Sequence, residues 1–196
     1  MDEPQGFLAI WSDVSGGDRT DYLHWLTREH IEERLSVPGF LSARVFCARR
    51  DDVNRYFILY DLREPGVVGS APYLERLNSP KPWSQRIMTR ITNFKRGGGK
   101  VVSRSGFGMG GLALPVVAAK EAAPAWSAPR PDLVCRISVL ATDLGQTTIA
   151  TAEKKLRGGD DSFAGLTVLE GFDEAALLRT AADAIAPEIY ELIFVK

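Results

Sequence analysis

The chain contains very few of the residues that build metal centres and disulfide frameworks. Its 196 residues include two histidines, His24 and His30, and two cysteines, Cys47 and Cys135. A structural zinc site takes four Cys or His ligands at characteristic spacings, so we expect no metal. Each cysteine lies within a strand-like apolar run, which favours buried free thiols in a reducing cytosol over a disulfide. We therefore expect a cytoplasmic protein without a metal site.

Long apolar runs and an excess of charge are also missing. No run approaches the ~20 residues that cross a bilayer, and the acidic N-terminus MDEPQG does not resemble a signal peptide. The net charge of −1 argues against bulk attraction to nucleic acid or to an anionic membrane. With 45% hydrophobic and 25% charged residues, the composition is instead typical of a globular protein with a sizeable core.

Acidic residues are absent from residues 76–120, where nine Lys or Arg lie, among them Arg86, Arg96 and Arg104. One interpretation is a phosphate-binding surface, but this stretch lacks the aromatic interleaving that single-strand binders use. We expect instead that carboxylates from elsewhere in the fold neutralise these cations. The sequence therefore predicts no nucleic-acid partner and no membrane partner.

The first 98 residues predict the element order β-α-β-β-α-β. Asp18 is a candidate cap for the first helix, and the sequence VPG ends it. This order is that of the ferredoxin-like fold, a four-stranded antiparallel sheet with both helices on one face. The periodicity predicts strands at 5–13, 39–50, 55–63 and around 88–94, and helices at 19–36, at 67–78 and from the sequence PKPW.

The uncovered face of this sheet requires a partner, because both faces of the strand at 55–63 are apolar. The second half supplies a similar pattern, since GLTVLEGFDEAALLRTAADAI repeats the strand, turn and helix of YFILYDLREPGVVGSAPYLERL. The glycine-rich GFGMGG leads into an apolar strand and therefore predicts a turn, not a dinucleotide loop. In that strand Pro115 requires an edge or a bulge. We predict an α+β fold of two ferredoxin-like repeats, 1–98 and 105–196, joined by a linker at 99–104 and packed sheet to sheet as one α+β barrel.

The sequence HWLTREH, followed by VPGF and a strand, and then YFILYDL with a helix after it, resembles the dimeric α+β-barrel superfamily. The EthD-like branch is the most similar one. The resemblance covers the first 98 residues and extends to the second half by topology, as an internal duplication. It implies a pocket between sheet and helix in each repeat, and the superfamily includes cofactor-free monooxygenases, lactone isomerases and haem proteins. We expect no cofactor, with His30 as an axial haem ligand the less favoured alternative.

His30 is the candidate catalytic residue. Leu23, Leu26 and His30 share one stripe of the first helix, so the imidazole should face the sheet and be placed to exchange a proton with a ligand. His24 is expected at the surface. The predicted ligand-binding residues are Trp11, Leu26, Tyr56 and Tyr60, with Arg44 or Arg86 to neutralise an anionic oxygen.

Two functions remain open at this point. In the first, a small apolar or aromatic molecule binds under the helix, and His30 is the general base of a cofactor-independent proton transfer or oxygenation. In the second, the protein is a non-catalytic carrier or an oligomeric scaffold. His30 is then a buried core residue with its hydrogen bonds satisfied, and no cavity of roughly 300 Å³ or more opens beside it. Further association into a homo-oligomer is compatible with both.

Overall fold

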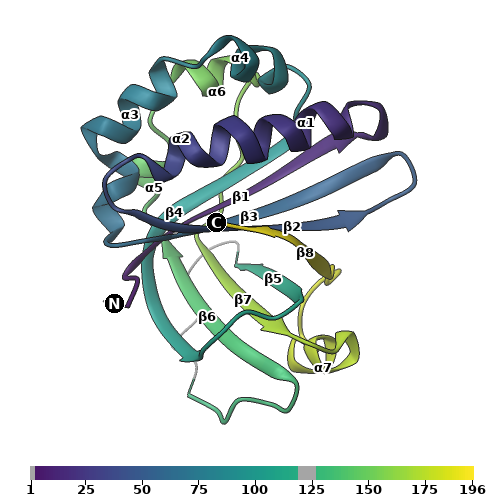
Figure 1. Ribbon diagram of the computed structural model, residues 1–196. Helices are drawn as coiled ribbons and strands as arrows, with labels where there is room; N and C mark the ends of the chain where they lie inside the picture. The colour runs from purple at the N-terminus through teal and green to yellow at the C-terminus, as the bar shows by residue number, and fades with distance from the viewer. Residues whose placement is uncertain (1–2, 119–126) are drawn as a thin grey trace.

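Eight antiparallel strands close into a barrel in the computed structural model, which describes residues 3–118 and 127–196 (Figure 1). Neighbouring strands follow the order β1-β3-β2-β8-β5-β7-β6-β4, and β4 pairs with β1 to complete the circle. The predicted fold class, an α+β barrel, is confirmed. The strands are β1 (Gly6–Ser15), β2 (Phe40–Arg49), β3 (Val53–Leu62), β4 (Thr92–Gly106), β5 (Leu112–Ala118), β6 (Val134–Thr142), β7 (Gly165–Gly171) and β8 (Tyr190–Val195).

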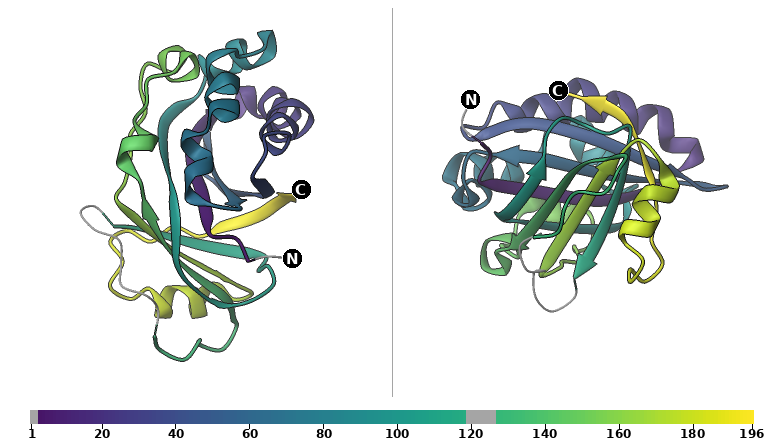
Figure 2. Two further views of the ribbon diagram at one scale, coloured as in Figure 1. Left: turned by 90° about the vertical axis from the view of Figure 1, so that its left-hand side faces the viewer. Right: turned by 90° about the horizontal axis from the view of Figure 1, so that it is seen from below.

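The two halves of the barrel share one internal strand order. When each half is numbered along the chain, both sheets run fourth, first, third, second, as β4-β1-β3-β2 and β8-β5-β7-β6. This is the order of a ferredoxin-like sheet. The joints between the halves are also equivalent, because β2 pairs with β8 and β6 pairs with β4. Each sheet therefore covers the face that the other would otherwise expose, as the side view in Figure 2 shows.

The helices lie outside the barrel and are divided unequally between the halves. The helices α1 to α4 pack over the first sheet, whereas α7 packs against β7 and β5 of the second (Figure 1). The short α6 belongs to the second half of the chain but contacts α3 and α4 over the first sheet. The α-helices are α1 (Arg19–Trp25), α2 (Ile31–Leu35), α3 (Ala71–Asn78), α4 (Pro82–Met88), α5 (Leu144–Thr147), α6 (Ala152–Leu156) and α7 (Glu174–Thr180).

Several predicted boundaries shift in the structure. A 3₁₀ turn, Gly16–Asp18, precedes α1, and the Oγ of Ser15, not a side chain of Asp18, accepts the N-terminal bond from the Asp18 amide. The helix predicted at 67–78 is divided into a 3₁₀ turn, Pro65–Gly69, and α3. The last predicted strand of the first half starts later, because Met88 still belongs to α4.

Residues 99–104, expected to be a linker, lie inside the 15-residue strand β4. The glycines of RGGGK are buried where this strand comes close to its neighbours: a side chain on Gly97 would run into the ring of Phe163, and one on Gly99 into the carbonyl of Ala141. The sequence GFGMGG forms the turn from β4 to β5, as predicted. Pro115 also lies as expected, because β8 pairs only with the first two residues of β5 and leaves the rest of that edge open.

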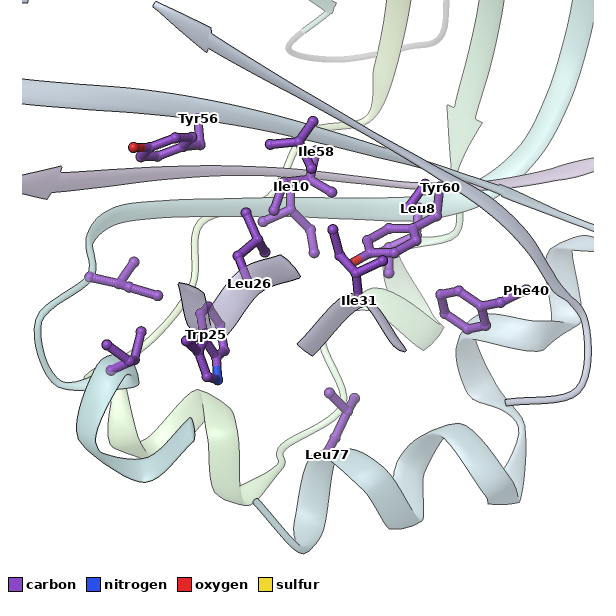
Figure 3. Packing of buried hydrophobic residues seen from close by; sticks show 14 of the residues in the cluster. Leu8, Ile10, Trp25, Leu26, Ile31, Phe40, Tyr56, Ile58, Tyr60 and Leu77 are labelled. Atoms are coloured by element: carbon purple, nitrogen blue, oxygen red, sulfur yellow. The ribbon is translucent and has the colours of Figure 1, made fainter. Parts of the chain in front are cut away.

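Apolar side chains on the two faces of each strand fill separate layers. Along β1, Phe7 and Trp11 lie in the barrel interior, whereas Leu8 and Ile10 pack under the helices of the first half. Figure 3 shows the helix layer, where Leu26 and Ile31 point from the helix toward the strands. This arrangement explains why both faces of the strands are apolar in sequence. No helix within the described ranges is long and apolar enough to cross a membrane.

Candidate functional site

The helix that carries His30 contains a wide turn at that position. Between α1 and α2 the residues Leu26–His30 form a π-helical turn, and the backbone stays helical from Arg19 to Leu35. A π turn inserts an extra residue into the helical repeat and is frequent at functional sites. Leu26 and His30 are both buried, as predicted, whereas Leu23 is only partly buried. Two of the three residues of the predicted stripe are therefore fully buried.

The His30 imidazole is buried and incompletely hydrogen-bonded. The residue is 5% exposed, and its ring lies 4.4 Å from the Trp25 ring between centroids. Its Nδ1 has no hydrogen-bond partner among the described residues. Burial, together with the nearby cations Arg34 and Arg157, holds the pKa of His30 well below its usual value of 6.5. The ring is thus neutral at physiological pH and has a lone pair available to accept a proton.

A small cavity lies beside His30, between the outer face of the first sheet and the helices. Its volume is about 20 Å³, enough for one water molecule and far below the size of a ligand pocket. Besides apolar atoms and Arg96, which is described below, the sheet contributes the hydroxyl of Ser12, which is hydrogen-bonded to Tyr22 at 2.9 Å. The apolar and aromatic lining consists of Ile10, Tyr22, Trp25, Ile58, Tyr73, Leu77, Met88, Ile91 and Phe94.

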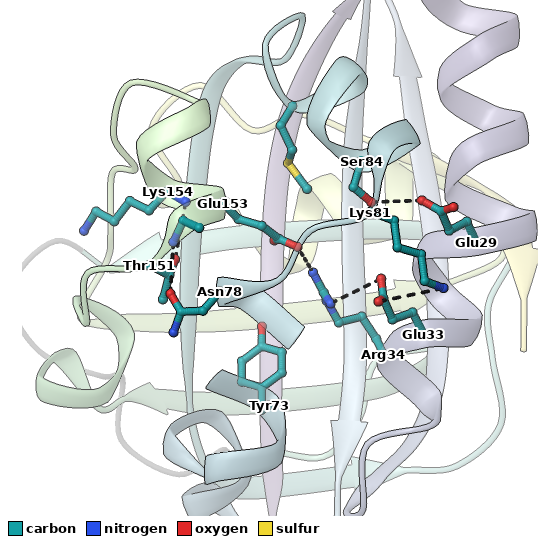
Figure 4. A network of polar contacts seen from close by, with 12 residues as sticks. Glu29, Glu33, Arg34, Tyr73, Asn78, Lys81, Ser84, Thr151, Glu153 and Lys154 are labelled. Atoms are coloured by element: carbon teal, nitrogen blue, oxygen red, sulfur yellow. Dashed lines mark hydrogen bonds and ion pairs between the residues drawn. The ribbon is translucent and has the colours of Figure 1, made fainter. Parts of the chain in front are cut away.

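Charged side chains close the cavity opposite the sheet. Arg34 of α2 donates a short hydrogen bond to the carboxylate of Glu153 on α6, and both groups are almost fully buried (Figure 4). Arg157, just after α6, lies 3.6 Å from Glu153, is held by Asp160 at 2.8 Å and covers the Phe94 ring. Ion pairs therefore tie a segment of the second half to the helix that carries His30.

Arg96 of β4 also lines the cavity. It is 4% exposed, its Nη2 lies 3.4 Å from the Tyr73 hydroxyl, and its Nε has no partner. It forms no ion pair with any described residue. A cation without a carboxylate is unusual in such a buried position.

Three of the predicted ligand-binding residues share the helix layer with His30. Leu26, Tyr56 and Tyr60 are buried there, but none of the three lines the cavity. Neither tyrosine hydroxyl has a partner among the described residues. Burial raises the pKa of Tyr56 to about 12 and raises that of Tyr60 further, so both phenols stay protonated. Their participation in a site remains a prediction.

The structure does not bring Trp11 or Arg44 to His30. Trp11 points into the barrel interior, where its ring lies 4.7 Å from that of Phe57. Arg44 is enclosed by ion pairs with Glu170 at 2.7 Å and Asp61 at 3.0 Å. Successive residues of a strand point to opposite faces of the sheet. Because both faces of these strands are apolar, the sequence did not show whether the odd-numbered or the even-numbered residues face the helices.

Three other cations of the acid-free stretch, unlike Arg96, pair with carboxylates. Arg86 binds Asp21 at 3.0 Å on the surface, and Arg90 binds Asp18 at 2.9 Å. Arg104 pairs with Asp61 at 2.9 Å. The expectation that distant carboxylates neutralise this stretch is confirmed for these three residues. His24 is exposed, as expected.

Sequence reasoning missed Arg34, Arg96, Glu153 and Arg157. The partners Arg34 and Glu153 are 119 positions apart, so no local pattern links them. The absence of acids around Arg96 was a usable signal, because a cation that becomes buried without a nearby carboxylate needs an anion from elsewhere. Chemically, the assembled site offers a neutral base beside guanidinium groups, an arrangement suited to removing a proton and stabilising the anion that results.

Comparisons with known proteins reveal similarity only at the level of the fold. No protein-family model matches the sequence, and no curated protein matches it. An anthrone oxidase-like protein superposes with a TM-score of 0.54 at 9% identity, over 100% of this chain and 93% of the other. A proposed monooxygenase from Fusobacterium nucleatum superposes with a TM-score of 0.51 at 8% identity, over 98% of this chain and 94% of the other. The chain thus has the overall fold of α+β-barrel proteins of this kind.

Proposed function

We propose that this chain binds a small molecule in the cavity beside His30, and that His30 acts there as a general base without a cofactor. The observation that carries the proposal is the buried Nδ1 of His30, which has no partner among the described residues and belongs to a side chain that lines the cavity. Buried polar atoms in native proteins are nearly always hydrogen-bonded. A ligand group that exchanges a proton with Nδ1 would account for the exception.

The chemistry follows from the surroundings of the ring. Neutral His30 accepts a proton from a C–H or O–H acid of the ligand. Arg34 and Arg157, which disfavour the imidazolium, favour the negative charge that forms on the ligand. The same cations promote return of the proton to the ligand or to another acceptor, so the base is regenerated.

Access to this site requires movement, because a cavity of about 20 Å³ is closed to a ligand. We propose that α6 is the part that moves. It is only five residues long, and it is held by the ion pair from Glu153 to Arg34 and by a bond from the Ala152 amide to Asn78 at 3.1 Å. Displacing these few contacts would extend the cavity toward solvent.

Oxygenation is the reaction to test first, since the two fold neighbours are described as a proposed monooxygenase and as anthrone oxidase-like. Anthrone has an acidic methylene, and its oxidation by O2 gives anthraquinone and water. In this reaction His30 would take a methylene proton, and the resulting carbanion would pass its electrons to O2. We expect O2 consumption with anthrone above the uncatalysed rate.

The matched variants are His30→Gln, which removes the base but keeps a polar side chain, and His24→Gln at the exposed histidine. Loss of a general base lowers the rate by about 10²–10⁴-fold. We expect this loss for His30→Gln and an unchanged rate for His24→Gln. If purified His30→Gln, folded by circular dichroism, oxidises anthrone as fast as the parent, the catalytic proposal is wrong.

The alternative is a non-catalytic carrier or scaffold in which His30 is structural. The observations that favour it are the 5% exposure of His30 and the closed cavity. It predicts that His30→Gln changes the thermal stability. It also predicts that the parent and the variant both convert every tested substrate no faster than the uncatalysed rate.

We also propose that the chain arose by internal duplication, with repeats at 1–98 and 105–196, and that it is related to the EthD-like branch of the dimeric α+β-barrel superfamily. The shared strand order and the equivalent joints support the duplication. The second repeat has no histidine, so a histidine-dependent site exists once per chain. Homo-oligomerisation and a cytoplasmic location remain predictions.

A further inference from the structure

Arg96 is a buried cation whose charge is not balanced by the protein around it. Its guanidinium lies 5.8 Å from the Tyr73 ring and 3.4 Å from that residue's hydroxyl, and no described carboxylate lies within ion-pair distance. A phenol hydroxyl and a ring face stabilise a cation far less than a carboxylate does. Retaining such a group therefore calls for a reason other than folding stability.

Three residues that line the cavity each have a buried polar atom without a hydrogen-bond partner. His30 Nδ1, Arg34 Nη1 and Arg96 Nε are all buried without a hydrogen bond to the described residues, and all three side chains line the same cavity. Arg34 Nη1 has an ion pair with Glu33 at 3.8 Å, whereas Arg96 has none among these residues. The two arginine atoms are donors with no capacity to accept. A water molecule is able to accept from both, but it leaves the charge of Arg96 uncompensated.

The charge balance at the cavity also indicates an anionic ligand. Glu153 is shared between Arg34 and Arg157, and Asp160 forms a bidentate pair with Arg157. The buried Glu33 is shared in the same way between Arg34, at 3.8 Å, and the half-exposed Lys81, at 3.9 Å. Counted with Arg96, four cations face three carboxylates, and Arg96 is the cation without an ion pair among the described residues. One anionic group at the position of the cavity would make the site neutral.

We infer that the ligand of this site is an apolar, aryl-type carboxylate whose anionic oxygens bind Arg96 while its rings lie against the sheet. This inference rests on the proposed function, because it uses the same cavity and names its ligand class. The apolar body follows from the lining by isoleucine, leucine, methionine and phenylalanine side chains. The carboxylate follows from the planar, paired donors that a guanidinium presents.

Two probes of nearly the same shape test the inference: the anion 2-naphthoate and its neutral amide, 2-naphthamide. Titration by fluorescence gives the Kd of each for the full-length protein. A buried charge-assisted hydrogen bond favours the carboxylate about 10-fold or more, so we expect naphthoate to bind at least that much more tightly. Equal affinity for the two probes, or no binding of either, overturns the inference.

The variant Arg96→Gln keeps a donor but removes the charge, and Arg86→Gln is the matched control on the surface. We expect Arg96→Gln to bring the two Kd values within about 3-fold of each other by weakening naphthoate alone, and Arg86→Gln to preserve the parental ratio. An unchanged ratio in Arg96→Gln overturns the inference. The proposed function is judged separately, since anthrone is uncharged and its His30-dependent oxidation does not require Arg96 to select a carboxylate.

Thermal unfolding without ligand provides a second test that does not depend on the choice of probe. If Arg96 serves binding at the expense of stability, Arg96→Met should raise the Tm, because it removes an unbalanced buried charge and retains an apolar stem. A lower Tm in Arg96→Met would show that Arg96 stabilises the fold and would overturn the inference.

Discussion

Two groups of buried arginines in this protein differ in how completely they are paired. The first group, which we call the barrel cluster, lies inside the barrel and consists of Arg44, Arg104 and Arg136 around the carboxylates of Asp61 and Glu170. Every arginine of this cluster has a carboxylate oxygen within 3.0 Å. Its strands come from both halves, so the cluster joins the two sheets across the interior.

The second group, which we call the cavity cluster, consists of Arg34, Arg96, Glu153, Arg157 and Asp160. It is built from the same residue types as the barrel cluster, but its arginines are not all paired. Its ion pairs join α6 to α2, but Arg96 is left without a carboxylate among the described residues. A fully paired cluster has a structural explanation in its own contacts. The incompletely paired one is the candidate site because its contacts leave a charge and several polar atoms unexplained.

The largest effect is expected from breaking the barrel cluster at Glu170. This carboxylate is fully buried and pairs with Arg44 and Arg136, each at 2.7 Å. Glu170→Ala removes a carboxylate partner from two buried arginines. Removing one member of a buried ion pair lowers the free energy of unfolding by about 3–5 kcal/mol. The measurement is the free energy of unfolding from urea titration. Glu191→Ala, at an exposed position on β8, should change it by less than about 0.5 kcal/mol. Similar values for the two variants would contradict a structural role for the barrel cluster.

A smaller effect is expected in the cavity cluster for Glu153→Gln. The amide oxygen still accepts a bond from Arg34 but no longer carries a charge, so the loss should not exceed about 1.5–3 kcal/mol, the contribution of a hydrogen bond to a charged group. Hydrogen exchange in α6 should rise more than exchange in the barrel strands, because the contact of Glu153 with Arg34 helps to hold this helix. Glu32→Gln, whose only ion-pair partner in the described ranges is the exposed Lys196, serves as control. Equal exchange in α6 of parent and Glu153→Gln would contradict the role of α6 as the mobile cover.

The barrel was predictable from the sequence because its signals are local. Alternation at 39–50, the turn after it and the apolar run at 55–63 correspond closely to β2 and β3. The need to cover an apolar sheet face correctly led to the second sheet. The continuation of β4 through 99–104 was missed, because glycines usually indicate flexibility and the close approach of Gly97 to Phe163 depends on distant packing.

The candidate site was predictable only in part. The helical stripe correctly placed His30 inside, but the π turn at Leu26–His30 has no signature in the single sequence. Trp11 and Arg44 were grouped with His30 because the face of each strand was ambiguous, and they lie in the barrel interior instead. The ion pairs of the cavity cluster connect the two halves of the chain, so they became visible only in the folded structure.

The smallest expected effect is the contribution of His30 to the pH dependence of stability. The folded pKa of His30 lies below its unfolded value, so between these two values the unfolded chain binds a proton that the folded chain excludes. The contribution of His30 is therefore fully favourable above pH 6.5 and is lost as the pH falls toward the folded pKa, with a slope approaching ~1.4 kcal/mol per pH unit. His30→Gln binds no proton in either state, so its free energy of unfolding should fall less steeply over this range. Urea titrations from about pH 8 to about pH 5 measure both profiles. If the profiles of the parent and His30→Gln are parallel, the imidazole takes up its proton as readily in the folded protein as in the unfolded chain. The desolvated surroundings and nearby cations that the proposed site places around His30 would then be absent.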